Sequence, residues 1–142
     1  MNKLREFCFY APLVVLIFSI LFSLILFIPI TMLAEYFPRW LRPNMGGWTF
    51  VVILVTNTVL SFLSLTVALN VFRFVRSNRL SSFLSFFWAV VAGYAMVLMN
   101  PKHPDFGFNL LIPLGFLIPQ IYSYYIFRKR LDSGYFDVGE IE

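Results

Sequence analysis

The chain of 142 residues is 60% hydrophobic and only 13% charged, and it carries a formal net charge of +4 at pH 7. Soluble globular domains average roughly 45–50% apolar and about 25% charged residues, so this composition excludes a soluble domain and indicates a protein embedded in lipid. The positive charge does not indicate nucleic-acid binding, because the basic residues flank apolar runs, where such residues set membrane topology.

Four long stretches contain no Asp, Glu, Lys, Arg or His. They lie between Glu6 and Glu35, between Arg42 and Arg73, between Arg79 and Lys102, and between Asp105 and Arg128. A helix needs about 20 apolar residues to cross the roughly 30 Å hydrocarbon core of a bilayer. Each stretch reaches that length, which predicts transmembrane helices near residues 8–33, 48–72, 81–99 and 107–127. The predicted fold is an all-α membrane protein, an antiparallel bundle of four transmembrane helices over residues 1–127 with short loops.

The Lys and Arg residues are divided unequally between the two ends of this predicted bundle. Those of the N-terminus, the second loop and the C-terminal tail are Lys3, Arg5, Arg73, Arg76, Arg79, Arg128, Lys129 and Arg130. Those of the opposite end are Arg39, Arg42 and Lys102. Because cytoplasmic loops carry the excess of Lys and Arg, both termini are expected in the cytoplasm. Small size and short loops favour a bacterial inner membrane.

The first two predicted spans differ in polarity. The first is almost wholly apolar, and we expect it to face lipid. The second has a polar face, because four small or polar residues fall within about 60° of arc at about 100° per residue. These residues are Asn57, Ser61, Ser64 and Ala68.

The third predicted span carries small residues at every fourth position: Ser81, Ser85, Ala89 and Gly93. Such a stripe lets a second helix approach closely, and we expect it to contact a partner. The polar face of the fourth span consists of Asn109, Pro113, Gln120 and Ser123. Pro113 cannot donate a hydrogen bond to the Asn109 carbonyl, so this carbonyl needs another partner in lipid. The simplest arrangement brings the polar faces of spans two and four together.

Two interpretations of these polar faces remain open. The side chains either hold the helices together through hydrogen bonds or line an uncharged path for a solute. The residues concerned are Asn57, Ser61, Ser64, Asn109, Pro113 and Gln120. Buried ionisable residues, the usual mark of coupled transport, are absent from all four predicted spans. This absence favours a packing role.

No motif indicates a catalytic, metal or cofactor site. The only histidine, His103, lies close to Asp105 in the third predicted loop, and two ligands do not make a zinc site. The single cysteine, Cys8, cannot form an internal disulfide. The sequence therefore predicts a protein that is not an enzyme and has no cofactor.

Residues 128–142 are predicted to form a short, flexible cytoplasmic tail. The tail begins with a basic triplet, which is typical of segments that bind anionic lipid. The acidic remainder holds two aromatic residues, Tyr135 and Phe136, which are candidate anchors for a cytoplasmic partner.

Spans, packing faces and short loops are the features from which a function must be inferred. They predict a membrane protein that acts by helix–helix contact with another membrane protein or with a second copy of itself. Two kinds of protein fit: an accessory or assembly subunit of a larger complex, and an immunity-type protein that blocks a pore-forming toxin. The alternative is a homo-oligomeric channel or small transporter with an uncharged polar path.

Overall fold

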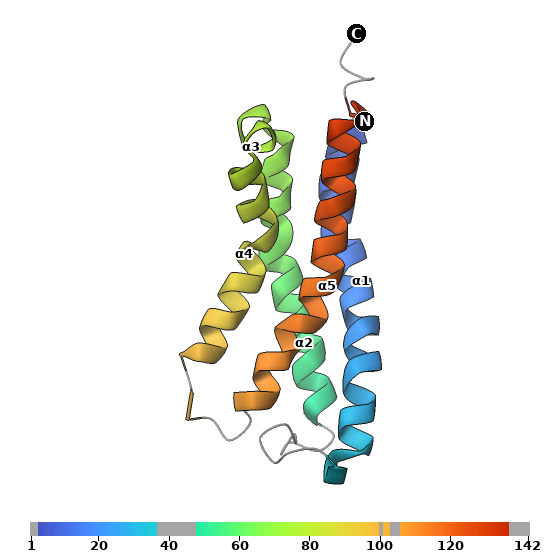
Figure 1. Cartoon of the computed structure of the whole chain (residues 1–142), viewed down its shortest axis with the longest axis vertical. Helices are drawn as coiled ribbons and strands as arrows, with labels where there is room; N and C mark the ends of the chain where they lie inside the picture. The colour runs from blue at the N-terminus through green and yellow to red at the C-terminus, as the bar shows by residue number, and fades with distance from the viewer. Residues whose placement is uncertain (1–2, 37–47, 100, 103–105, 137–142) are drawn as a thin grey trace.

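The computed structural model describes residues 3–36, 48–99, 101–102 and 106–136, and the regular secondary structure in these ranges is entirely helical (Figure 1). In chain order the elements are α1 (Lys3–Met32), η1 (Ala34–Tyr36), α2 (Trp48–Leu63), η3 (Ser64–Val71), α3 (Arg73–Ser77), α4 (Arg79–Leu98) and α5 (Phe106–Asp132). Here η marks a 3₁₀ segment, and η3 continues directly from α2.

Among the described residues, four helical segments are long and apolar enough to cross a membrane, namely α1, the run Trp48–Val71 formed by α2 and η3, α4 and α5. This confirms the prediction of an all-helical chain with four such segments, consistent with an integral membrane protein. The two middle segments match the predicted spans closely, whereas α1 begins earlier and α5 ends later. A run without charged residues predicts only the part of a helix that lies in hydrocarbon. Lys, Arg and Glu are good helix formers, so the helices continue through the charged residues beyond that part.

The extension of α5 is stabilised by one partly buried side chain. The Arg128 guanidinium donates to the Arg76 carbonyl oxygen over 3.3 Å and lies 3.6 Å from the Asp132 carboxylate. These contacts join the end of α5 to α3 and to its own next turn. As a result the predicted boundary at residue 127 falls inside the helix.

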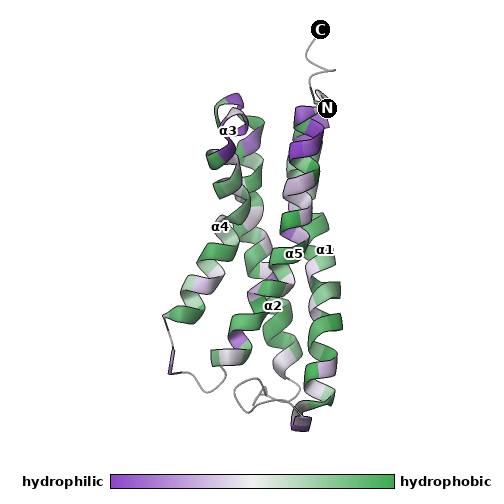
Figure 2. Cartoon of the chain, in the orientation of Figure 1, coloured by the Kyte–Doolittle hydropathy of each residue, from purple (hydrophilic) through white to green (hydrophobic). Residues whose placement is uncertain are grey.

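The start of α1 and the end of α5 lie at the same end of the bundle as α3, and the end of α1, the start of α2, the end of α4 and the start of α5 lie at the other end (Figure 1). The long helices therefore alternate in direction along the chain. The hydrophilic residues collect at the end that holds the termini, whereas the helix bodies are mainly hydrophobic (Figure 2). This distribution places the basic ends of α1 and α5 beside each other.

The first helix leaves most of its large apolar side chains exposed, as expected of a helix that faces lipid, but it also buries one face. The buried residues of α1 follow a spacing of three to four and are mostly small: Leu4, Cys8, Ala11, Pro12, Val15, Ser19, Ser23, Phe27 and Ile30. This face packs against α5, η3 and α2. A uniformly apolar helix gives no amphipathic contrast, and therefore hydropathy alone did not reveal the face.

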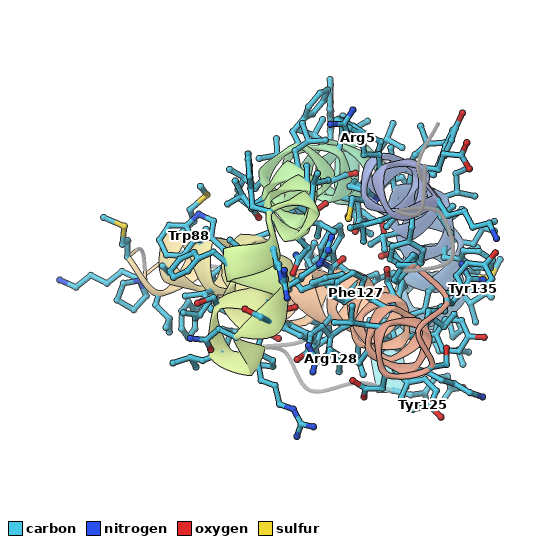
Figure 3. The ribbon with its side chains drawn as sticks, turned by 90° about the horizontal axis from the view of Figure 1, so that it is seen from above. Arg5, Trp88, Tyr125, Phe127, Arg128 and Tyr135 are labelled. Carbon is cyan, nitrogen blue, oxygen red and sulfur yellow. The ribbon has the colours of Figure 1, made fainter. Side chains whose placement is uncertain are left out.

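Aromatic rings fill the core near the two termini. The Phe127 ring of α5 is fully buried, and its centroid lies 5.3 Å from that of Phe86 in α4 and 5.7 Å from that of Phe7 in α1 (Figure 3). Tyr124 adds an edge contact to Phe86 at 5.2 Å. This cluster joins α1, α4 and α5 at the end where their basic residues lie.

Candidate functional site

The polar face of α2 is bonded to α1. The Asn57 Nδ2 atom donates to the Ser23 hydroxyl over 3.1 Å and to its own helix at the Ile53 carbonyl over 3.0 Å. One turn later, the Ser61 hydroxyl donates to the Pro12 carbonyl over 2.9 Å. The expectation that the polar faces of spans two and four meet is therefore corrected, because α2 uses its polar groups on α1.

The polar face changes its spacing where α2 becomes the 3₁₀ segment η3. With about 3.0 residues per turn, every third residue points the same way. The buried residues of η3 are accordingly Ser64, Val67 and Asn70, while Ala68 is only half-buried. The Ser64 hydroxyl donates to the Ser61 carbonyl over 2.7 Å, so it holds the chain at this transition.

Asn70, which was not among the predicted site residues, connects this segment to α4. Its Nδ2 donates to the Ser85 hydroxyl over 2.5 Å, and the Thr66 hydroxyl donates to the Ser85 carbonyl over 2.6 Å. Counting every third residue from Ser64, as a 3₁₀ helix requires, leads through Val67 to Asn70 on the buried face. Counting every fourth residue, as for an α-helix, leads to Ala68 instead.

The stripe of small residues on α4 packs against the chain's own helices. Ser85, Ala89 and Gly93 are buried and Ser81 is half-buried. A side-chain Cβ on Gly93 would lie 2.9 Å from the Leu60 Cδ2 atom of α2. The stripe does provide a close helix approach, but the approach is internal. Because the other three residues are buried, only the half-buried Ser81 remains partly accessible to a partner protein.

The polar face of α5 is divided between two surroundings. Gln120 is buried, and its Nε2 donates to the Phe86 carbonyl of α4 over 2.6 Å. Pro113 is also buried, but Asn109 is half-buried at the other end of the helix. The amide oxygens of Asn57, Asn70 and Gln120 are buried without a hydrogen-bond donor among the residues described. These three amides thus bind neighbouring helices through nitrogen alone.

A cleft of about 350 Å³ separates α2, α4 and α5 toward the end opposite the termini. Its walls hold the Thr56 hydroxyl of α2 and the Asn109 amide of α5, and Gly93 and Pro113 lie deeper in it. Neither Thr56 nor Asn109 makes a side-chain hydrogen bond with any part of the chain that the structure describes. The other lining residues are mostly aliphatic: Val52, Val55, Val59, Leu60, Met96, Val97, Phe106 and Ile112.

The first residues of the predicted tail are folded onto the helices. Gly134, with φ 68°, ends α5 in a Schellman motif, in which the Tyr135 amide donates to the Arg130 carbonyl and the Gly134 amide to the Leu131 carbonyl. Phe136 is buried, with its ring centroid 5.9 Å from those of Phe7 and Phe127.

This docking corrects two predictions for the tail. Phe136 is buried and is therefore not free to anchor a partner, and residues 128–136 of the tail predicted as flexible at 128–142 are helix or turn. Tyr135 is exposed, whereas residues 137–142 lie outside the described part of the chain.

Within the described ranges, no group of three or more His, Cys, Asp or Glu side chains is placed to hold a metal ion. His103 and Asp105, the candidate pair of the third loop, lie outside those ranges. Comparisons with protein-family models, with curated proteins and with solved structures find no match to this chain.

Proposed function

We propose that this chain is a non-catalytic membrane protein whose cleft between α2, α4 and α5 binds a transmembrane helix of another membrane protein. The observation that carries the proposal is the presence of two side chains without hydrogen bonds, Thr56 and Asn109, in one lateral cleft of the described structure. In hydrocarbon such groups have no water to bind, and a polar or backbone group on a second helix satisfies them.

The shape of the cleft also supports a protein helix as its occupant. Two valines of α2, Val55 and Val59, line one wall and Met96 of α4 lines another, so an apolar helix finds apolar surface on two sides. The Asn109 amide then provides a directional contact that lipid tails do not use. This combination of small, apolar and amide groups is typical of helix interfaces in membranes.

The buried polar residues support contact over conduction. Asn57 binds Ser23 and Gln120 binds the Phe86 carbonyl, so their donors already hold neighbouring helices together. Neither residue lines the cleft, the groove between α1 and α5, or the groove between α1 and α2. In a homo-oligomeric channel, the path for the solute would therefore not be lined by Asn57 and Gln120 inside one bundle.

Photo-crosslinking from inside the cleft tests the proposal. A photoreactive amino acid at Val55 or at Met96 faces the cleft, and both positions are more than half exposed. In native membranes both positions should give an adduct with the same protein. The matched control is Phe62, which is at least as exposed but lies in the groove between α1 and α2, and it should not give this adduct.

Polar-to-apolar substitutions then identify the contact. An interhelical hydrogen bond contributes about 0.6–1.7 kcal/mol, so Asn109→Leu and Thr56→Val should each weaken binding by roughly threefold to twentyfold. Thr58→Val is the control, because the Thr58 hydroxyl donates to the Leu54 carbonyl of its own helix over 2.8 Å. Equal adduct yields in all three variants would contradict the proposal.

The identity of the adduct separates the versions of this function. A resident membrane complex as partner makes the chain an accessory or assembly subunit, and a pore-forming toxin makes it an immunity-type protein. An adduct with twice the mass of the chain indicates a second copy of itself.

We also propose that both termini and α3 lie in the cytoplasm, and that the membrane is a bacterial inner membrane. The concentration of Lys and Arg at this end supports the orientation. Lys102 is the one basic residue that the structure describes at the opposite end.

A further inference from the structure

A second groove lies between α1 and α5 and shares no lining residue with the cleft. It encloses about 570 Å³ and is lined almost wholly by hydrocarbon, including Phe7, Val14, Leu21, Ile25, Ile118 and Tyr122. At about 1.5 Å per residue, the stretch from Phe7 to Ile25 extends about 27 Å along α1. Half of the roughly 30 Å hydrocarbon core is one leaflet, so the groove can hold the full length of a lipid acyl chain.

Two cations stand at the end of this groove that lies beside the termini. The Lys3 ammonium is 4.9 Å and the Arg130 guanidinium 5.2 Å from the centroid of the same Tyr135 ring. Arg130 also lies 5.5 Å from the ring of Phe7, which lines the groove. Tyr135 is found beside the ends of α1 and α5 (Figure 3).

The helical period places both cations in line with the groove walls. Lys3 is one turn before Phe7, and Arg130 is one turn after Ile126, which also lines the groove. Both side chains are exposed, and neither forms an ion pair with a residue in the described ranges. Two like charges gathered around one ring repel each other, and an anion beside them offsets this repulsion.

We infer that this groove binds one anionic phospholipid, with an acyl chain along α1 and α5 and the phosphate beside Lys3 and Arg130. Charge complementarity supports this occupant, because basic pockets between transmembrane helices bind anionic headgroups. The apolar walls match the acyl tail of a phospholipid, and the basic end of the groove matches its phosphate.

The walls favour an acyl chain over a helix of a protein. Large side chains such as Phe18, Leu21 and Ile25 project along the groove, and they keep a helix backbone from approaching closely. A flexible acyl chain follows such a surface by rotating its own bonds. The inference is independent of the proposed function, since the cleft can fail to bind a helix while the groove still binds lipid.

Native mass spectrometry of the full chain, with phosphatidylglycerol or phosphatidylcholine added to the detergent, tests the inference. The unmodified protein should retain one phosphatidylglycerol in preference to phosphatidylcholine. Removing both cations, in Lys3→Gln with Arg130→Gln, should lower the affinity for phosphatidylglycerol about thirtyfold, or about fivefold for each charge. The affinity for phosphatidylcholine should stay unchanged.

The control for the cations is Arg5→Gln with Arg79→Gln, which removes the same charge from the same end. Arg5 points away from Tyr135 (Figure 3), and Arg79 belongs to α4. The control should keep the preference for phosphatidylglycerol. If both double variants lose it equally, the attraction is a general surface charge effect and the proposed site is wrong.

The acyl-chain part has its own test. Val14→Trp or Ile118→Trp fills the groove at a half-exposed wall position and should abolish lipid retention, whereas Leu54→Trp, on an equally exposed face of α2, should not. Glycerol phosphate should not compete, because it has the headgroup charge without the chain. Retention of phosphatidylglycerol by the filled variants, or competition by glycerol phosphate, would overturn the inference. Unchanged helicity and unfolding temperature in zwitterionic detergent show that each variant is folded.

Discussion

Ser23 of α1 lies directly against Gly115 of α5: a Cβ placed on Gly115 would sit 3.5 Å from the Ser23 Cα and 3.2 Å from its Cβ, and would overlap its hydroxyl. The same hydroxyl accepts the hydrogen bond from Asn57 of α2. One small residue thus brings α5 onto α1 and connects α1 to α2. Close packing and interhelical hydrogen bonds are the forces that hold helices together in lipid, and this junction uses both.

Gly115→Ala should therefore destabilise the protein, although alanine is the better helix former by about 1 kcal/mol. The added methyl group forces α1 and α5 apart, and overpacking of this kind costs about 1–3 kcal/mol. Ser23→Ala removes the overlapping hydroxyl, and the double variant should be more stable than the sum of the single effects. Unfolding in mixed detergents, followed by circular dichroism, measures the cycle. Strict additivity would show that the two residues are not in contact.

The 3₁₀ winding of η3 makes a prediction that an α-helix would not. In a Cys8→Ser background, Asn70→Cys and Ser85→Cys should form a disulfide under mild oxidation, because these two side chains are in contact. The pair Ala68→Cys and Ser85→Cys should not, since Ala68 lies on a different side of η3. Chain cleavage between the two positions, followed by gel electrophoresis with and without reductant, separates these outcomes. Efficient bridging by position 68 and not by 70 would indicate an α-helix through this segment.

The turn that follows α5 should behave as part of the folded bundle. Phe136→Ala removes a ring buried against Phe7 and Phe127, and such truncations cost about 3–5 kcal/mol. The expected result is fraying of the last turn of α5 and faster tryptic cleavage after Lys129 and Arg130. Tyr135→Ala, at an exposed position, should accelerate cleavage much less. Equal rates in both variants would mean that residue 136 does not hold the turn.

The number and approximate limits of the long helices were predictable, because runs of hydrocarbon length without any charge are rare outside membrane-spanning segments. The role of α1 was not. Its packing face consists of small residues such as Ala11, Ser19 and Ser23, and two serines in a long apolar run leave the overall hydropathy of the helix high. Spacing of small residues, applied to every span, would have found this face. The same criterion selects α4, whose Gly93 lies close to Leu60 of α2, but it does not distinguish an internal partner from an external one.

The interior contacts could not be predicted for a different reason. Asn57 and Gln120 were selected as polar interior residues, but an amide in lipid accepts any helix as its partner, and the sequence contains no preference among them. Which helix each amide contacts depends on how α1 and α4 are rotated about their axes and cross α2 and α5. The winding of η3 is similar, because its sequence suits an α-helix, and the contacts of Thr66 and Asn70 with Ser85 accompany the tighter turn.

The orientation of the bundle in the membrane can be measured by thiol labelling at its two ends. In a Cys8→Ser background, Ser133→Cys places an exposed thiol at the end with the termini, and Lys102→Cys places one at the opposite end. Because Lys and Arg concentrate at the first end, a membrane-impermeant maleimide should label intact bacteria at position 102 and not at 133. Both should be labelled after the membrane is permeabilised, which controls for thiol reactivity. Labelling of position 133 in intact cells would indicate the opposite orientation, with both ends of the chain outside the cytoplasm. It would also move the basic end of the α1–α5 groove away from the cytoplasmic leaflet, whose anionic lipids are the expected source of its ligand.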